Sequence, residues 1–100
     1  PFESVVKIVK DFNIDVAGIM HTDVNAVSKS LKVLRNFFDG PLMVYPDSGG
    51  WVSPNWDFDK VIQPRHLKSF AEKWIKEGVN IIGGCCGLSP NHIREIAQLK

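Results

Sequence analysis

The sequence lacks several features that mark the common special classes of protein. Its 12 basic and 11 acidic residues leave a net charge of +1, so no excess charge favours nucleic acid or an anionic membrane as a partner. No apolar run approaches the roughly 20 residues that a membrane-spanning helix needs, and no segment resembles a signal peptide. Two adjacent cysteines make no disulfide framework, so we expect a reducing, cytoplasmic setting.

The sequence does contain enough apolar material for a core. Its 100 residues are 44% hydrophobic and 10% aromatic, which suits one small domain over residues 1–100. The chain does not begin with methionine, and we expect it to be a fragment of a longer protein.

Apolar periodicity predicts helices that alternate with short buried strands. The expected helices cover residues 1–12, 24–37, 64–77 and 90–99. The expected strands cover residues 15–20, 42–45 and 79–83, and a long polar and aromatic loop is expected over residues 46–63. Alternating helices and strands indicate an α/β fold with right-handed crossovers and a parallel sheet.

The carboxyl ends of parallel strands lie at one edge of a sheet, where proteins of this class carry their sites. We therefore expect the three strand ends to face the same side. Three parallel strands alone would leave two apolar edges unpaired. We expect the chain to supply the last three βα units, the sixth to the eighth strands, of a TIM (β/α)8 barrel.

Both cysteines follow the last expected strand. Residues 80–87 read NIIGGCCG, and Ser89 and Pro90 then begin a helix. Adjacent residues of a regular strand point to opposite faces, so two thiols converge only where glycines let the backbone leave the strand. Such a pair suits zinc. The other interpretations are core packing and a redox pair, although redox pairs are usually spaced C-x-x-C.

The segments around the three strand ends resemble the C-terminal part of the homocysteine S-methyltransferase domain. They are GIMHT at residues 18–22, YPDSG at 45–49 and GGCCGLSPNHI at 83–93, and the resemblance runs from about Val16 to the end. It implies a zinc-dependent (β/α)8 barrel. It also implies methyl transfer from a sulfonium, betaine or folate-type donor to the thiol of homocysteine, giving methionine, so both partners would be small molecules.

The family pattern carries over to three metal-binding positions. Cys85 and Cys86 correspond to two of the three zinc-binding cysteines, and His21 stands where the third is expected. Histidine is a zinc ligand in its own right, so the resemblance implies a Cys2His site with one open position. Imidazole in place of a thiolate makes the site one charge more positive. The other interpretation of His21 is a hydrogen-bonded residue near Thr22 and Asp23.

The second strand end is the expected substrate-binding segment. Asp47, where the family has asparagine, and Ser48 could hold an amino-acid substrate, with Tyr45 in the barrel wall. Proline, aspartate, serine and glycine in succession are also ordinary turn chemistry, so a turn remains the alternative.

Further along the loop, aromatic residues could line a pocket for a cationic methyl donor or pack beneath the loop. They are Trp51, Trp56 and Phe58. Met20 and Met43 are expected in the core.

Two interpretations concern residues near helix starts. Asp23 could orient His21, but we expect it instead to cap the following helix. His66 and His92 are expected at surface or capping positions.

Three functions compete with homocysteine methylation. A family member could act on a different thiol or selenol, which the replacement at His21 suggests. A non-catalytic metal-binding module is the second alternative. A truncated fragment without independent function is the third.

Overall fold

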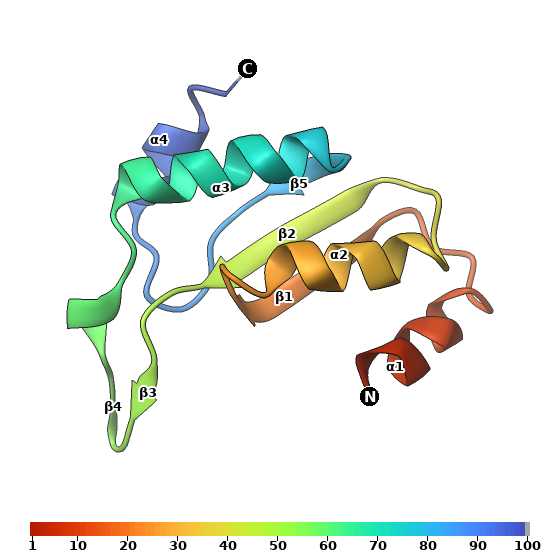
Figure 1. The fold of residues 1–100 in the computed structure, drawn as a ribbon, viewed down its shortest axis with the longest axis horizontal. Coiled ribbons are helices and arrows are strands. Elements are labelled where there is room, and N and C mark those ends of the chain that lie inside the picture. Colours follow the sequence, from red (N-terminus) through yellow and green to blue (C-terminus); the bar gives the residue numbers. More distant parts are fainter. Residues whose placement is uncertain (100) are drawn as a thin grey trace.

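The computed structural model describes residues 1–99, and it confirms the predicted alternation of helices and strands (Figure 1). The elements in chain order are α1 (Phe2–Val9), β1 (Ala17–Asp23), α2 (Val27–Arg35), β2 (Leu42–Asp47), β3 (Trp51–Val52), β4 (Asn55–Trp56), η1 (Phe58–Lys60), α3 (Pro64–Lys76), β5 (Val79–Ile82) and α4 (Pro90–Ile96). Local sequence explains several boundaries: Pro64 and Pro90 lie in the first turns of α3 and α4. Gly78, with φ +93°, ends α3 in a conformation that favours glycine.

Strands β1, β2 and β5 form a parallel sheet with β2 in the centre (Figure 1). Leu42 of β2 is in register with Ala17 of β1 and with Val79 of β5. All three strands run in the same direction, so their carboxyl ends lie at one edge. The predicted α/β fold with a parallel sheet is therefore confirmed.

The core lies between one face of this sheet and helices α2 and α3. Every second residue of β2 is buried, which is the pattern of a strand with one well-covered face. The largest fully buried side chain is Trp74 of α3, and Leu42, Leu67 and Val27 are also fully buried. Helix α1 packs against α2 (Figure 1).

The opposite sheet face is apolar but open, and here the prediction for Met20 was wrong. Met20 is 50% exposed and Met43 is half-buried. Ile81, in register with Met43, is 41% exposed. Strand alternation sends Ile19 to the helices and Met20 to the other side. An apolar run predicts a strand, but it does not say which of the two faces is covered.

Residues 46–63, predicted to be a loop, contain short regular elements that were not predicted. Strands β3 and β4 pair antiparallel as a small hairpin that projects from the sheet, and η1 follows (Figure 1). Trp51 and Phe58 are 66% and 68% exposed, so they are not packed beneath the loop. Trp56 is half-buried and its indole N–H donates to the carbonyl of Ser48 at 2.9 Å. Within residues 1–99, none of the helices is long and apolar enough to cross a membrane.

Candidate metal centre

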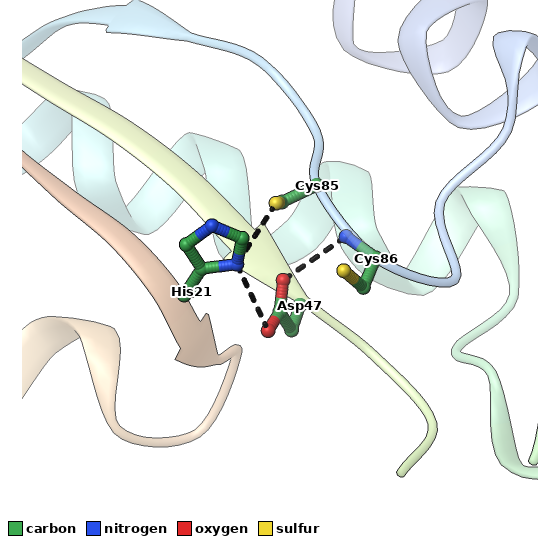
Figure 2. A group of neighbouring side chains, drawn as sticks. All are labelled: His21, Asp47, Cys85 and Cys86. Atoms are coloured by element: carbon green, nitrogen blue, oxygen red, sulfur yellow. Dashed lines mark hydrogen bonds and ion pairs between the residues drawn. The ribbon is translucent and has the colours of Figure 1, made fainter. Parts of the chain in front are cut away.

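Four potential metal ligands meet at the carboxyl edge of the sheet (Figure 2). They are His21 of β1, Asp47 of β2, and Cys85 and Cys86 of the segment that follows β5. One donor atom from each lies within 4.8 Å of all the others. The parallel sheet explains this convergence, because residues far apart in the sequence end neighbouring strands. The prediction that His21 and both cysteines meet at one edge is confirmed.

A bulge in β1 presents His21 to the other donors. Met20 pairs with Tyr45 and Thr22 pairs with Pro46, so His21 is the extra residue between consecutive partners. Its φ of 51° is the one positive φ among non-glycine residues in the described chain. The left-handed conformation costs an L-residue about 1–2 kcal/mol. Such local strain at a strand end is typical of a functional site.

The cysteine segment is held against the end of β2 by backbone hydrogen bonds. Cys85 N–H donates to the Pro46 carbonyl at 3.0 Å, and Ser48 N–H donates to the Cys86 carbonyl at 3.0 Å. Gly87 then turns the chain with φ +80°. A Cβ atom there would also collide with the Ser48 carbonyl oxygen. Both the positive φ and this close approach therefore require glycine.

Asp47 divides its two carboxylate oxygens between the backbone and the donor group. Oδ1 accepts the Cys86 N–H at 3.0 Å, and Oδ2 lies 3.9 Å from Nδ1 of His21 (Figure 2). The same Nδ1 lies 3.3 Å from Sγ of Cys85. The Asp47 carboxylate and the Cys85 sulfur therefore lie near the same imidazole nitrogen, Nδ1. Asp47 does not lie on the opposite side of the ring from the other potential ligands. Asp47 was predicted to bind substrate, and its position among the potential metal ligands was not predicted, although an acidic side chain at a strand end could have indicated it.

The other two predicted substrate residues have different surroundings. Ser48 is only 4% exposed, and its hydroxyl oxygen accepts the Ile62 N–H at 2.8 Å. Tyr45 is half-buried, and its ring lies so close to Gly83 that a Cβ there would collide with it. Their substrate contacts stay predictions, and the structure adds a packing role for each.

Of the residues expected near helix starts, Asp23 differs from the prediction. Oδ1 of Asp23 accepts the Asn25 N–H at 2.9 Å, whereas the N-cap of α2 is Ala26. Asp23 therefore forms a turn before the helix and does not cap it. His92 belongs to the capping box of α4, as expected, and it is buried, with 5% exposure. His66 is exposed, as expected.

The electrostatics of the metal-free site favour a protonated thiol. Burial is the largest cause that raises the pKa of Cys85, and the neighbouring carboxylate of Asp47 raises it further. A metal ion would reverse this preference, because metal ligation needs the thiolate. Zinc bonds of about 2.3 Å to sulfur and about 2.0 Å to nitrogen place neighbouring tetrahedral ligands about 3.5 Å apart. Sulfur, imidazole and carboxylate donors within 4.8 Å fit that requirement.

Comparison with known proteins identifies the family. The family model described as "Homocysteine S-methyltransferase" matches residues 1–99. Homocysteine S-methyltransferase 1 of Saccharomyces cerevisiae is 33% identical over 95 residues, which cover 86% of this chain and 28% of the relative. Selenocysteine methyltransferase of Astragalus bisulcatus is 26% identical over 85 residues, which cover 82% of this chain and 25% of that protein.

A solved structure shows the same fold. The metallated form of the homocysteine methyltransferase MmuM from Escherichia coli matches with a TM-score of 0.73 and 24% identity. The match covers 100% of this chain and 30% of that chain. The chain thus spans about a quarter to a third of the length of these relatives. On the match of its whole described length, the chain belongs to the homocysteine S-methyltransferase family.

Proposed function

We propose that this chain carries the metal-binding edge of a zinc-dependent methyltransferase that methylates the thiol of homocysteine to give methionine. The single observation that carries the proposal is the meeting of His21, Asp47, Cys85 and Cys86 within 4.8 Å. Membership of the family supports the reaction class. The donor set supports zinc over a hard cation, because thiolates select soft metals.

We further propose that the chain forms the last three βα units of a (β/α)8 barrel. The open apolar sheet face supports this proposal, because the inside of such a barrel is a packed core of side chains. Met20 and Ile81, both on that face, are 50% and 41% exposed. The site then lies at the carboxyl edge of the strands, as in other barrels of this type.

Cys85, Cys86 and His21 would hold the zinc ion, with a fourth position for a substrate sulfur. Bound zinc supplies Lewis acidity that keeps a thiol deprotonated near neutral pH, so that the thiol is nucleophilic. The sheet holds the donor atoms in place, because they lie at three neighbouring strand ends. A substrate sulfur would therefore approach the metal from a defined direction. The bulge at His21 brings its ring to the donor group in place of a third cysteine.

Asp47 has two candidate roles in this site. Its Oδ1 is occupied by the Cys86 N–H, while Oδ2 faces the donor atoms. That oxygen could occupy the fourth metal position until a thiol arrives. It could instead hold the ammonium group of an amino-acid substrate, with Ser48 and Tyr45 nearby. Both roles use the negative charge of Asp47 at the same place.

An activity assay of the intact protein tests the proposal. Purified protein is incubated with homocysteine and, in separate reactions, a sulfonium, a betaine or a methylfolate, and methionine is measured. We expect one donor to support turnover, a chelator to abolish it and added zinc to restore it. Activity that survives complete metal removal, or purified protein that neither contains nor takes up zinc, would overturn the proposal.

A selenol substrate is the second candidate function. One relative is named selenocysteine methyltransferase, and this site carries His21 among its potential ligands. The same assay with selenocysteine in place of homocysteine compares the two by their kcat/KM values. A higher kcat/KM for the selenol would favour this second function.

A further inference from the structure

The two buried polar side chains of the described residues belong to one hydrogen-bonded circuit behind the cysteines. These side chains are Ser48, 4% exposed, and His92, 5% exposed. Neither offers an atom to the potential metal ligands. Burying a polar group costs free energy unless the group is hydrogen-bonded. The hydrogen-bond partners of Ser48 and His92 therefore show which segments these side chains hold in place.

The circuit starts at the cysteine segment and returns to it. Ser48 N–H donates to the Cys86 carbonyl at 3.0 Å, and the Ser48 hydroxyl accepts the Ile62 N–H at 2.8 Å. The Ile62 carbonyl lies 2.7 Å from Nε2 of His92. Nδ1 of His92 lies 3.0 Å from the backbone nitrogen of Ser89 and 2.9 Å from its hydroxyl oxygen. Ser89 follows Cys86 by only three residues, so the ring of contacts closes on the cysteine segment.

The backbone partners of His92 determine which ring nitrogen donates a hydrogen bond and which accepts one. A backbone N–H can only donate, so Nδ1, which faces Ser89 N–H, carries no proton. A carbonyl can only accept, so Nε2, which faces Ile62, carries the proton. The Nε2–H tautomer thus joins the start of α4 to the end of the loop that contains β3 and β4. The joined segments enclose the turn at Gly87.

We propose that His92 is a positioning residue for the cysteine pair and acts through Ile62 and Ser48 on the backbone of Cys86. The proposal rests on the proposed metal centre, because a fixed Cys86 backbone matters by holding the Cys86 sulfur in position to bind the metal. Without the imidazole, the Ile62 carbonyl and the Ser89 N–H lose their partners. The loop can then move away from the cysteine segment, and the Cys86 backbone loses its constraint.

The test compares three variants of the intact protein. His92→Leu removes all three hydrogen-bonding contacts of the imidazole, with Ser89 N–H, the Ser89 hydroxyl and the Ile62 carbonyl. His92→Gln keeps an acceptor and a donor at about the spacing of the two ring nitrogens, because both pairs are attached to one carbon. His66→Leu, the same change at an exposed histidine of α3, is the matched control. Zinc affinity is measured by chelator competition, and the visible spectrum of the Co²⁺-loaded protein reports ligand geometry.

We expect His92→Leu to weaken zinc binding by about tenfold, in the range seen when groups that support metal ligands are removed. The cobalt spectrum should change with it. His92→Gln should recover most of the affinity, and His66→Leu should match the parent. Unchanged affinity and spectrum in His92→Leu, or equal losses in the Leu and Gln variants, would overturn the proposal. If His92→Leu does not fold, Ser48→Ala, which breaks the circuit at a small residue, takes its place with the same expected loss.

A metal-free probe separates this proposal from the proposed function. Phenylarsine oxide binds two thiols only when both reach one point, and it needs no zinc. If the parent takes up no zinc, the proposed function fails, and arsenical binding still tests the circuit. His92→Leu should then bind the arsenical about tenfold more weakly than the parent. Equal binding by the two would overturn the positioning role.

Discussion

Nδ1 of His21 lies 3.3 Å from Sγ of Cys85, although 64 positions separate the two residues in the sequence. The contact joins the first and last strands of the sheet across β2, whose own end contributes Asp47. It exists because β1 bulges at His21 and because β5 ends before its cysteines. Both edge strands therefore depart from regular pairing at the site.

The first prediction separates the two roles of His21, as a metal ligand and as a strained backbone position. His21→Ala and His21→Gly should both weaken zinc binding by at least about tenfold, because each removes the imidazole. Without metal, His21→Gly should be more stable than His21→Ala by about 1 kcal/mol, because glycine adopts φ 51° without a steric penalty. Chelator competition and urea unfolding of the metal-free proteins measure the two effects. A zinc affinity equal to that of the parent would show that His21 is not a ligand.

The second prediction concerns the cysteines themselves. Cys85→Ser and Cys86→Ser should each abolish zinc retention during dialysis, because serine does not supply a soft thiolate donor. Metal content after dialysis, measured by elemental analysis, decides the outcome. Ser69→Ala, at an exposed residue of α3, is a suitable control and should retain the metal. Full zinc content in either cysteine variant would remove that residue from the ligand set.

The third prediction distinguishes the two candidate roles of Asp47. Asp47→Asn keeps an acceptor for the Cys86 N–H but removes the charge, whereas Asp47→Ala removes both. If Asp47 is a ligand, zinc affinity should fall by about tenfold in the Asn variant and further in the Ala variant. If it holds the substrate ammonium, the Asn variant should keep its zinc affinity and show a raised KM for homocysteine. Asp59→Asn, at an exposed residue of η1, is the control for charge alone.

Much of the fold was predictable because its signals are local. Short apolar runs bounded by polar residues indicated β1, β2 and β5, and helical spacing indicated the helices between them. Parallel topology followed from the alternation. The expectation that His21, Cys85 and Cys86 lie at one edge followed from that topology, because parallel strands end at the same edge.

The remaining features depend on contacts between distant segments. The bulge at His21 is a matter of pairing register, which no local pattern reports. Oδ1 of Asp47 accepts a hydrogen bond while Oδ2 faces His21, and this arrangement depends on the position of the Cys86 N–H in the folded chain. Burial of His92 was missed because a capping box usually carries Glu or Gln at this position, and the partner, Ile62, lies 30 positions away.

The fourth prediction tests the close approach beneath the cysteine turn. Gly87→Ala should destabilise the protein by more than about 1 kcal/mol, because φ +80° disfavours alanine and its Cβ would collide with the Ser48 carbonyl. Displacement of this turn should also weaken zinc binding. Gly50→Ala is the matched control, since a Cβ there meets nothing within 4 Å. Thermal unfolding and chelator competition measure both effects, and equal behaviour of the two variants would contradict the structure at this turn.

The last prediction concerns pH and follows from Cys85. Burial, and then Asp47, raise the pKa of this thiol above its ordinary value, so Cys85 is protonated at neutral pH in the metal-free protein. A thiol with a raised pKa in the folded state stabilises the metal-free fold at lower pH and loses that contribution as pH rises through its titration. Metal binding must displace the proton, so zinc affinity should increase with pH and binding should release protons.

Calorimetric titration with zinc, in two buffers of different ionisation heat at one pH, counts the released protons. Thiolate absorbance of metal-free Cys86→Ser, which leaves a single thiol, follows Cys85 directly. Asp47→Asn in that background should lower the pKa of Cys85, because it removes one of the causes that raise it. Asp59→Asn should leave it unchanged. Zinc binding without proton release at neutral pH would mean that the Cys85 thiol is already ionised, and burial would then not be the largest influence on its pKa.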